Sequence, residues 1–451
     1  MFDRARKCLI IAAGRGSRLA SGGLPKPLFR LLGLSLIERS LVNATRAGFT
    51  EFVVVTGYQS DRVTVSLDRL AKRRGLNITH VVNEKWDGGN GLSVLAAREV
   101  IGDDTFVLLM ADHLVDVSLL SGLREAELEA GEVCLAIDSN LLNPLVDLDD
   151  VTKVRTRDGQ LEAIGKNLEH YDAFDTGCFL CSADLFSALD QARNQEGDES
   201  LSAGIAFLAE RGKMRVHDIG DAFWIDVDDA RAAARAERAL IAGLPKLGDG
   251  PISRNLNRPL SIRITRRLID RSISPNQISI FCFALGLVAA GLFAVGGTLW
   301  LAVGGLLAQT ASVLDGCDGE VARLRLEESE FGGWFDAVLD RYTDAFLLFG
   351  LTWHVFFSAG GGPFALFVGF MAITGSFLVS YTADKYDGLM KTRFQRGESL
   401  GFRIGRDLRV LMIALGAVFN LPLLALSLIA VVMNAETVSR IVAASREPAE
   451  A

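Results

Sequence analysis

Four aspartates occur at helical spacing in a short stretch that joins two apolar segments. Asp315 and Asp318 are three residues apart, and Asp336 and Asp340 are four residues apart, so each pair shares one face of a helix. The intervening residues 323–333 can turn the chain back, which would direct all four carboxylates at one point. Oxygen ligands of this kind suit Mg²⁺ or Mn²⁺. A divalent ion held there would bridge a pyrophosphate group, and one carboxylate would remain as a general base.

Small and basic residues around the aspartates extend this prediction. Gly319 and Ala322 are small enough for a nucleotide to approach the backbone, and Arg323 supplies a cation for a phosphate. Gly332 loosens the start of the following helix. A cluster of solvated charges at helix ends is the alternative interpretation, and the full pattern DxxDGxxAR followed by GxxxDxxxD makes it much less favourable.

That pattern resembles the signature of the CDP-alcohol phosphatidyltransferase family. The resemblance implies six transmembrane helices, usually in a dimeric protein. It also implies transfer of a phospho-alcohol from a CDP-alcohol to a second alcohol, with release of CMP. By the same resemblance, Asp315, Asp318 and Asp336 bind the metal ion, and Asp340 binds the metal ion or acts as the base.

The second half of the chain is the source of the high hydrophobic content, which is 49%. Most of its apolar segments approach the ~20 residues that a bilayer span requires. They predict an all-α six-helix transmembrane domain over residues 277–446, although a soluble helical bundle is an alternative. The six segments are 277–297, 299–322, 333–357, 363–383, 407–420 and 421–440.

Uncharged and basic connections alternate between these segments, which predicts their orientation. The positive-inside rule places the basic connections, the N-terminal domain and both candidate sites in the cytoplasm, at the inner membrane. Residues 241–276 are interpreted as a linker and a helix at the membrane interface, with a plain solvated linker as the alternative. In the third basic connection, Lys391 and Arg393 either hold an acceptor phosphate or only set the topology. Arg406 belongs to the same basic connection and is given only the topological role.

The first half, residues 1–240, alternates short apolar runs with amphipathic stretches. This alternation predicts a Rossmann-like α/β domain with a parallel sheet wrapped by helices. The runs CLIIAA, EFVVVTGY, THVVN and TFVLLMAD are interpreted as strands buried on both faces, and the first of them as a strand rather than a signal peptide. A net charge of −8 argues against binding to nucleic acid.

A glycine-rich loop follows the first strand and carries cations. From Ala13 onward, Gly14 and Gly16 allow a tight loop whose N–H groups can face phosphates, while Arg18 and Lys26 would offset the charge of a triphosphate. A dinucleotide-binding loop is the rival interpretation, but the third glycine of GxGxxG is absent. The stretch resembles the sugar-phosphate nucleotidyltransferase family, whose signature is GxGxRL followed by PKPL.

Carboxylates at strand ends complete this second prediction. Asp112 follows a strand at the carboxyl edge of the sheet, where α/β proteins bind ligands. The resemblance implies that Asp112 and Asp226 hold Mg²⁺ or Mn²⁺. Asp228 is the second choice as a ligand from the same stretch as Asp226. Strand-end aspartates that only cap helices are the alternative.

Further residues are candidates for recognising the substrates. Asn90 and Gly91 lie in a glycine-rich turn that could read a base or an alcohol, although a plain turn is equally compatible. Lys166 is a candidate phosphate contact, with a solvated surface position as the alternative. Asp175 could bind a polyol hydroxyl.

The combination of the two halves indicates coupled reactions, because one half makes an activated alcohol of the kind that the other consumes. Together with the stretches NGLSV, MADH, TKV, IGK, DTG and DGPISRNLNRPLSI, this combination resembles the family of bifunctional inositol-1-phosphate cytidylyltransferases and di-myo-inositol phosphate phosphate synthases over nearly the whole chain. This resemblance implies that CTP and inositol 1-phosphate give CDP-inositol and pyrophosphate. CDP-inositol and a second inositol 1-phosphate then give di-myo-inositol phosphate phosphate and CMP. Transfer of CDP-inositol or another CDP-polyol onto a membrane lipid is the alternative.

Overall fold

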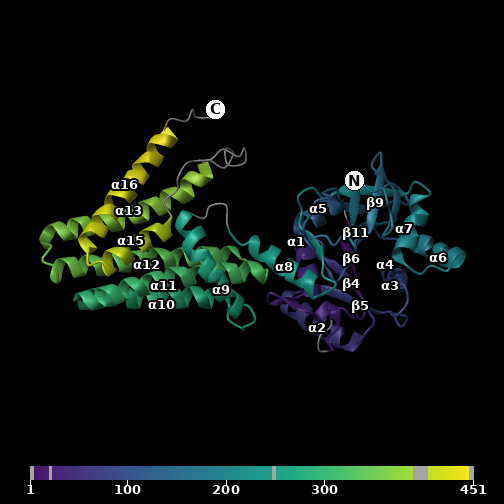
Figure 1. Ribbon diagram of the computed structural model, residues 1–451, viewed down its shortest axis with the longest axis horizontal. Coiled ribbons are helices and arrows are strands. Elements are labelled where there is room, and N and C mark those ends of the chain that lie inside the picture. The colour runs from purple at the N-terminus through teal and green to yellow at the C-terminus, as the bar shows by residue number, and fades with distance from the viewer. Residues whose placement is uncertain (1–4, 20–22, 246–249, 390–404, 446–451) are drawn as a thin grey trace. The chain divides into compact units, whose positions relative to one another are not determined.

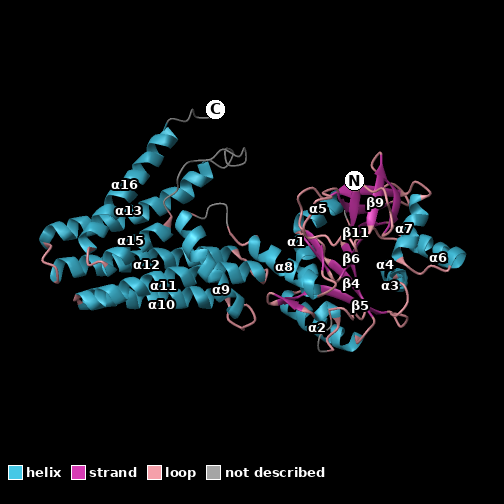
Figure 2. Ribbon diagram, viewed as in Figure 1, coloured by secondary structure: helices cyan, strands magenta, loops and turns pink. Residues whose placement is uncertain are grey.

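The computed structural model divides the chain into two compact units, Met1–Leu240 and Ile241–Ala451, which are described separately (Figure 1). Among the described residues, strands occur only in the first unit, and the second is helical (Figure 2). The described residues are 5–19, 23–245, 250–389 and 405–445.

A nine-stranded mixed sheet forms the first unit, in the order β5-β4-β1-β6-β11-β8-β12-β10-β9. Strands β5, β4, β1 and β6 are parallel, as predicted, but β11 runs antiparallel to both β6 and β8. The prediction of a parallel sheet is therefore confirmed for these four strands, but the sheet as a whole is mixed, because apolar runs indicate burial and not strand direction. The strands are β1 Lys7–Ala12, β4 Glu51–Thr56, β5 Asn77–Val82, β6 Phe106–Met110, β8 Val133–Asp138, β9 Lys153–Arg157, β10 Gln160–Gly165, β11 Ala173–Cys181 and β12 Met214–Asp218.

Helices cover both faces of this sheet, and neighbouring residues of a central strand enter different cores. Ile10 packs with Val54 and Val107 on one face, whereas Leu9 and Ile11 belong to the core on the other face. This explains the continuous apolar run of β1. The helices are α1 Leu36–Arg46, α2 Ser60–Arg74, α3 Asn90–Ala96, α4 Arg98–Ile101, α5 Val117–Glu125, α6 Asp184–Glu196, α7 Leu201–Ala209 and α8 Ala230–Ala242, with the short 3₁₀ helix η1 Lys26–Leu28.

Strand β5 departs from the sequence prediction. None of its residues is fully buried, and Val82 is 54% exposed. The strand lies at the edge of the sheet, with only β4 as a neighbour. The prediction that it is buried on both faces is therefore wrong. Two small two-stranded sheets complete the unit: β2 Arg30–Leu31 with β3 Leu34–Ser35, and β7 His113–Val115 with β13 Trp224–Asp226.

Four helices of the second unit are long and apolar enough to cross a membrane, among the residues that the structure describes. They are α10, α11, the Gly362–Ala383 part of α13, and the Pro422–Val442 part of α16. Large apolar side chains on their outer surfaces, such as Phe281 and Phe370, are more than half exposed, as expected for contact with lipid. The helices are η2 Ser253–Asn257, α9 Arg258–Leu268, α10 Pro275–Val295, α11 Thr298–Leu324, α12 Glu330–Phe357, α13 Gly362–Leu389, α15 Arg406–Val418 and α16 Pro422–Ser445.

The remaining two predicted spans correspond to α12 and α15. Helix α12 has 28 residues but carries Asp336 and Asp340 in its first half and Asp344 just past its midpoint, and α15 has only 13 residues. Six membrane crossings therefore remain a prediction, and the chain has four candidate spans within its described part. Between α11 and α12, residues 325–329 make the expected turn, and Ser329 caps α12 by accepting a hydrogen bond from the N–H of Gly332.

Candidate active sites

Lys26 is the central cation of the first candidate site. Its side chain is only 8% exposed, and its Nζ donates to Asp112 Oδ2 at 2.5 Å and contacts the Asp228 carboxylate. Asp226 Oδ1 lies 4.0 Å away. Burial lowers the pKa of Lys26, but the surrounding carboxylates outweigh this effect and raise it above its ordinary value. Lys26 therefore carries a positive charge within a group of three carboxylates.

The loop after β1 is shaped around this lysine. Gly16 has φ +60°, and a Cβ at this position would overlap the Lys26 side chain, so glycine is required there on two grounds. At Gly14, φ is not in the left-handed region and a Cβ would meet open space, so neither reason requires glycine there. Ala13 is buried, and its carbonyl accepts a hydrogen bond from the N–H of Tyr58 at 2.9 Å.

Asp112, His113 and Asp226 form a metal-type cluster next to Lys26. One potential ligand atom from each lies within 4.8 Å of the others, because strands β7 and β13 pair Asp226 with His113 in register. His113 Nδ1 donates to Thr176 O at 2.7 Å, so Nε2 faces the aspartates. Asp226 Oδ1 is buried without a hydrogen-bond partner in the described residues. This donor set fits a divalent ion. Sequence reasoning gave His113 no role, although it follows Asp112 directly.

Burial and charge act differently on these groups. Burial raises the pKa of Asp226 to about 6 and outweighs the opposing charge of His113. Burial would also raise the pKa of Asp112, but Lys26 and His113 hold it below its ordinary value. For His113, the nearby Asp226 and Asp112 outweigh burial and raise the pKa. A metal ion would compete with protonation of His113 Nε2 and would favour the ionised form of Asp226.

Replacing Asp226 with asparagine is expected to stabilise the first unit at pH 7.5 when divalent ions are removed with EDTA. The raised pKa means that Asp226 favours folding below its ordinary pKa of 3.8 and loses that contribution as the pH rises through about 6. The Asp226 side chain is 39% exposed, so solvent screening reduces the expected gain in local stability to about 1 kcal/mol. This gain corresponds to about fivefold slower local hydrogen exchange.

The measurement is hydrogen–deuterium exchange of peptides that contain β13, in wild type and Asp226→Asn. Exchange should be slower in the variant at pH 7.5, and the difference should shrink at pH 5. Mg²⁺ should slow exchange in the wild type but not in the variant. A difference that grows at pH 5, or an equal response to Mg²⁺, would contradict this account.

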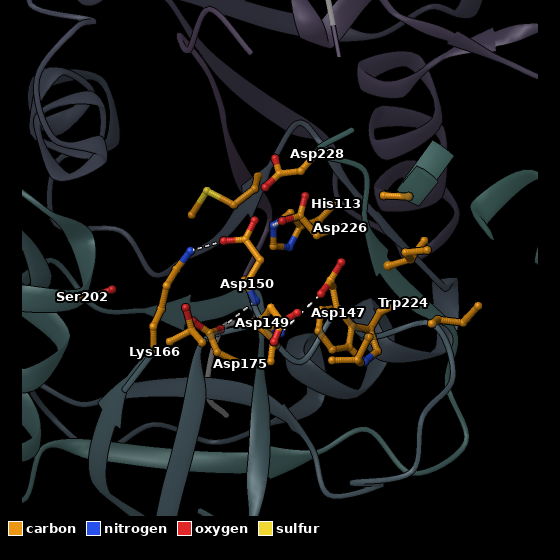
Figure 3. A pocket seen from close by; sticks show the side chains of 18 of the residues that line it. His113, Asp147, Asp149, Asp150, Lys166, Asp175, Ser202, Trp224, Asp226 and Asp228 are labelled. Carbon is orange, nitrogen blue, oxygen red and sulfur yellow. Dashed lines mark hydrogen bonds and ion pairs between the residues drawn. The ribbon is translucent and has the colours of Figure 1, made fainter. Parts of the chain in front are cut away.

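A cavity of about 530 Å³ opens beside the cluster, and Asp150 stands in it between two cations. Asp150 accepts from Lys166 Nζ at 2.5 Å and from Arg18 Nη1 at 2.7 Å, and Figure 3 shows Lys166 reaching Asp150. The hydrogen bond from Lys166, followed by the one from Arg18, lowers the pKa of Asp150 to about 2. The structure thus brings the predicted Arg18 and Lys166 together through a carboxylate to which the sequence analysis gave no role.

The other predicted substrate residues differ in whether they line the cavity or serve the packing of the fold. Asp175 lines the cavity. Burial raises the pKa of Asp175 and outweighs the hydrogen bond from the N–H of Gly177, which acts to lower it. Asn90 also lines the cavity, but its Oδ1 accepts from the N–H of Leu201 and so caps α7. Gly91 is buried, and a Cβ there would lie 2.6 Å from Glu199 O, so its small size is needed for packing.

The second candidate site gathers the aspartates of α11 and α12. Asp315, Asp336 and Asp340 each place a carboxylate oxygen within 4.8 Å of the others. The predicted convergence is therefore confirmed for these three. Asp318 is buried beside them and accepts a hydrogen bond from Ser279 of α10. Asp336 Oδ1 is buried without a hydrogen-bond partner in the described part of the chain, which fits a bound hard cation.

Arg406, at the start of α15, neutralises part of this negative charge. Its Nη1 lies 2.7 Å from both Asp315 Oδ2 and Asp340 Oδ1, and its Nε donates to Asp344 Oδ1 at 3.2 Å. Asp344 in turn accepts from Arg409 Nη2 at 2.7 Å. Sequence reasoning gave Arg406 only a topological role; its distance along the chain from the aspartates left no local signal.

A cavity of about 570 Å³ lies beside these aspartates. Gly319, Ala322 and Arg323 line it, and their closeness to a nucleotide stays a prediction. Part of its wall comes from η2 and α9. Lys391 and Arg393, the predicted acceptor contacts, lie outside the described residues.

Comparison with known proteins assigns each half to a family. Residues 8–206 match the model of the MobA-like NTP transferase domain, and residues 272–442 match that of CDP-alcohol phosphatidyltransferase. The second half also resembles the archaetidylinositol phosphate synthase of Pyrococcus horikoshii, with 29% identity over 194 residues, which cover 42% of this chain and 93% of that protein.

Several relatives match both halves at once, and two of them illustrate the match. The chain is 39% identical over 445 residues to the bifunctional IPC transferase and DIPP synthase of Rubrobacter xylanophilus, covering 97% of this chain and 96% of the relative. It is 32% identical over 410 residues to the protein of the same name from Aquifex aeolicus, covering 90% of each. The chain therefore belongs to the family of bifunctional IPC transferases and DIPP synthases, as a transferase in which a nucleotidyltransferase domain precedes a CDP-alcohol phosphatidyltransferase domain with membrane-spanning helices.

Proposed function

We propose that the first unit converts CTP and inositol 1-phosphate into CDP-inositol and pyrophosphate, and that the second unit consumes this CDP-inositol. The observation that carries the proposal is the presence of two acidic, metal-type clusters in separate units of one chain, each beside its own cavity. Full-length similarity to bifunctional IPC transferases and DIPP synthases supports the same pairing of reactions.

In the first reaction, a phosphate oxygen of inositol 1-phosphate attacks the α-phosphorus of CTP, and pyrophosphate leaves. Lys26 and Arg18 bind phosphate oxygens in place of their present carboxylate partners and offset the charge that develops. Lys166 orients the inositol phosphate, and Asp175 contacts a ring hydroxyl. Mg²⁺ or Mn²⁺ held by Asp112 and Asp226, with His113, would supply further positive charge.

In the second reaction, a hydroxyl of a second inositol 1-phosphate attacks the β-phosphorus of CDP-inositol, and CMP leaves. The products are di-myo-inositol phosphate phosphate and CMP. Asp340 accepts the proton of the attacking hydroxyl, and its contact with Arg406 orients the carboxylate. Asp315, Asp318 and Asp336 would hold the divalent ion that offsets the diphosphate charge.

The proposal includes the setting of these reactions. The second unit, over residues 277–446, crosses a cytoplasmic membrane six times as a homodimer, and residues 1–240 and both sites face the cytoplasm. The four candidate spans and the basic connections support this arrangement. Residues 241–276 would join the two domains at the membrane surface.

Labelled inositol 1-phosphate, CTP and Mg²⁺ supplied to the purified chain test the proposed function. We expect stoichiometric release of pyrophosphate, followed by a water-soluble labelled product that chromatography separates from CDP-inositol. EDTA should stop both steps. A parallel reaction with added bilayer lipid tests a lipid as the acceptor. The similarity of the second half to an archaetidylinositol phosphate synthase is the reason for testing this alternative. Label found only in the organic phase would favour that acceptor, and absence of pyrophosphate would contradict the proposed first reaction.

A further inference from the structure

The segment ahead of the first candidate span forms part of the wall of the second site. Ser253, Asn257, Arg258 and Ser261, on η2 and α9, line the cavity that also contains the aspartates of α11 and α12. Ser253, Asn257 and Ser261 are buried. This segment is therefore packed against the site rather than being a solvated linker, which was the alternative in the sequence analysis.

Glu320 attaches α9 to the helix that carries the first two aspartates. It lies between Gly319 and Val321 in the acidic motif, and its side chain has no exposed surface. It accepts hydrogen bonds from Arg258 Nη1 at 2.9 Å, Ser261 Oγ at 2.5 Å and Thr265 Oγ1 at 2.6 Å. A buried carboxylate with three donors is held strongly in place, because losing any of them leaves a polar group unsatisfied.

A second attachment holds the other end of α9. Arg325, just after α11, is buried and donates to Ile269 O at 2.6 Å and to Ile273 O at 2.7 Å, which lie at and beyond the C-terminal end of α9. Glu320 and Arg325 thus fix both ends of α9 against α11 independently. The position of Arg258 relative to the aspartates is therefore a built feature of the unit.

The charges around the cavity show what such an arginine would bind. Among the described residues that line it, only Arg258 and Arg323 are basic, and Asp315, Asp318 and Asp336 are among six acidic ones. Arg258 is 12% exposed, and its Nη1 lies 3.5 Å from the carbonyl of Gly316, the residue after Asp315. A planar guanidinium with five N–H donors suits phosphate oxygens, and Arg258 presents one in the wall of this cavity.

We propose that Arg258 binds a phosphate group of the substrate in the second site, and that Glu320 is the positioning residue that aims it. The inference rests on the proposed transfer reaction. The phosphate belongs either to the diphosphate of the CDP-alcohol or to the monophosphate of the acceptor. These two sources share the same chemistry and differ in which KM depends on Arg258.

The first test is Arg258→Gln in the full chain, assayed for transfer from supplied CDP-inositol to inositol 1-phosphate. We expect KM for one of the two substrates to rise by at least about tenfold, with kcat changed by less than about threefold, because the lost contact is made in the bound state. Arg258→Lys should recover part of the KM. Arg263→Gln is the matched control, since Arg263 is exposed on the same helix and does not line the cavity. It should leave both KM values unchanged.

The double variant Arg258→Gln/Glu320→Gln separates substrate binding from a structural role. If Arg258 only neutralises buried Glu320, removing the carboxylate as well should restore the wild-type KM, because no unpaired buried charge remains. If Arg258 binds phosphate, the double variant should keep the raised KM while folding at least as well as the single variant. Restoration of KM would overturn the proposal.

Glu320→Gln alone tests the positioning role. It should raise the same KM as Arg258→Gln but by a smaller factor, and adding it to Arg258→Gln should give less than the product of the two effects. A KM equal to that of the wild type would show that Glu320 does not aim Arg258.

Failure of the inference is distinguishable from failure of the proposed function. If the wild type transfers and Arg258→Gln has unchanged KM values, the inference alone is wrong. If the wild type shows no transfer, the proposed second reaction is wrong, and calorimetric titration of the full chain with CMP and with inositol 1-phosphate tests Arg258 directly. At least about tenfold weaker binding of one of them by Arg258→Gln would support the inference, and equal binding of both would reject it.

Discussion

Asp340→Asn is expected to abolish transfer from supplied CDP-inositol, by at least about a thousandfold, while CTP-dependent release of pyrophosphate continues at the wild-type rate. The side chain of Asp340 lies within 4.8 Å of Asp315 and Asp336 and contacts Arg406. Asparagine keeps the shape of the side chain but can neither accept the proton of the acceptor hydroxyl nor contribute a negative charge to the metal-type cluster.

The two activities of the same purified protein provide the internal control for this prediction. Asp270→Asn is the matched variant, because Asp270 is an exposed carboxylate in the same unit and away from the cavity. It should transfer normally. Residual transfer within about tenfold of wild type in Asp340→Asn would rule out Asp340 as the base. That outcome would leave it at most an accessory ligand.

The reverse separation is expected when the first site is changed. Lys26→Ala and Asp112→Asn should each lower the release of pyrophosphate by at least about a hundredfold and leave transfer from supplied CDP-inositol intact. Lys26 is the buried cation shared by Asp112 and Asp228. Its removal takes away a charge at the phosphates and a hydrogen-bond donor from Asp112 and Asp228.

Folding has to be checked for these two variants, because loss of one member of a partly buried ion pair also destabilises the unit. Circular dichroism and hydrogen exchange of β1 and β6 peptides serve this purpose, with Mg²⁺ present to offset the carboxylates. Lys72→Ala, at an exposed position on α2, is the matched control and should keep both activities. If either Lys26→Ala or Asp112→Asn stops both reactions in folded protein, the assignment of one reaction to each unit is wrong.

Local sequence patterns predicted the parts of both sites that depend on short-range geometry. The spacing of Asp336 and Asp340 on one helix, together with the turn before α12, was sufficient to predict their convergence with Asp315. The glycine-rich loop with Gly16, Arg18 and Lys26 was likewise predicted from residues close together in the chain, and the structure adds that Gly16 lies against Lys26. These features need only helix periodicity and chain reversal, which a sequence displays directly.

Partners from distant parts of the chain were missed or misjudged. Asp150 joins Arg18 to Lys166 although 132 residues separate it from the former, and Arg406 reaches Asp315 across 91 residues. The edge position of β5 and the antiparallel direction of β11 have the same origin, since an apolar run does not record which strands become its neighbours.

The sequence by itself determined the two kinds of chemistry and the helical or strand character of the elements that carry them. Only the tertiary structure decided which counter-charges face those groups: His113 beside Asp226, Arg406 between Asp315 and Asp340, and Glu320 beneath Arg258. The physical reason is that propensity and periodicity act over a few residues, whereas electrostatic pairing depends on distance in space. Residues far apart in the chain become each other's strongest electrostatic neighbours only once the cores have packed.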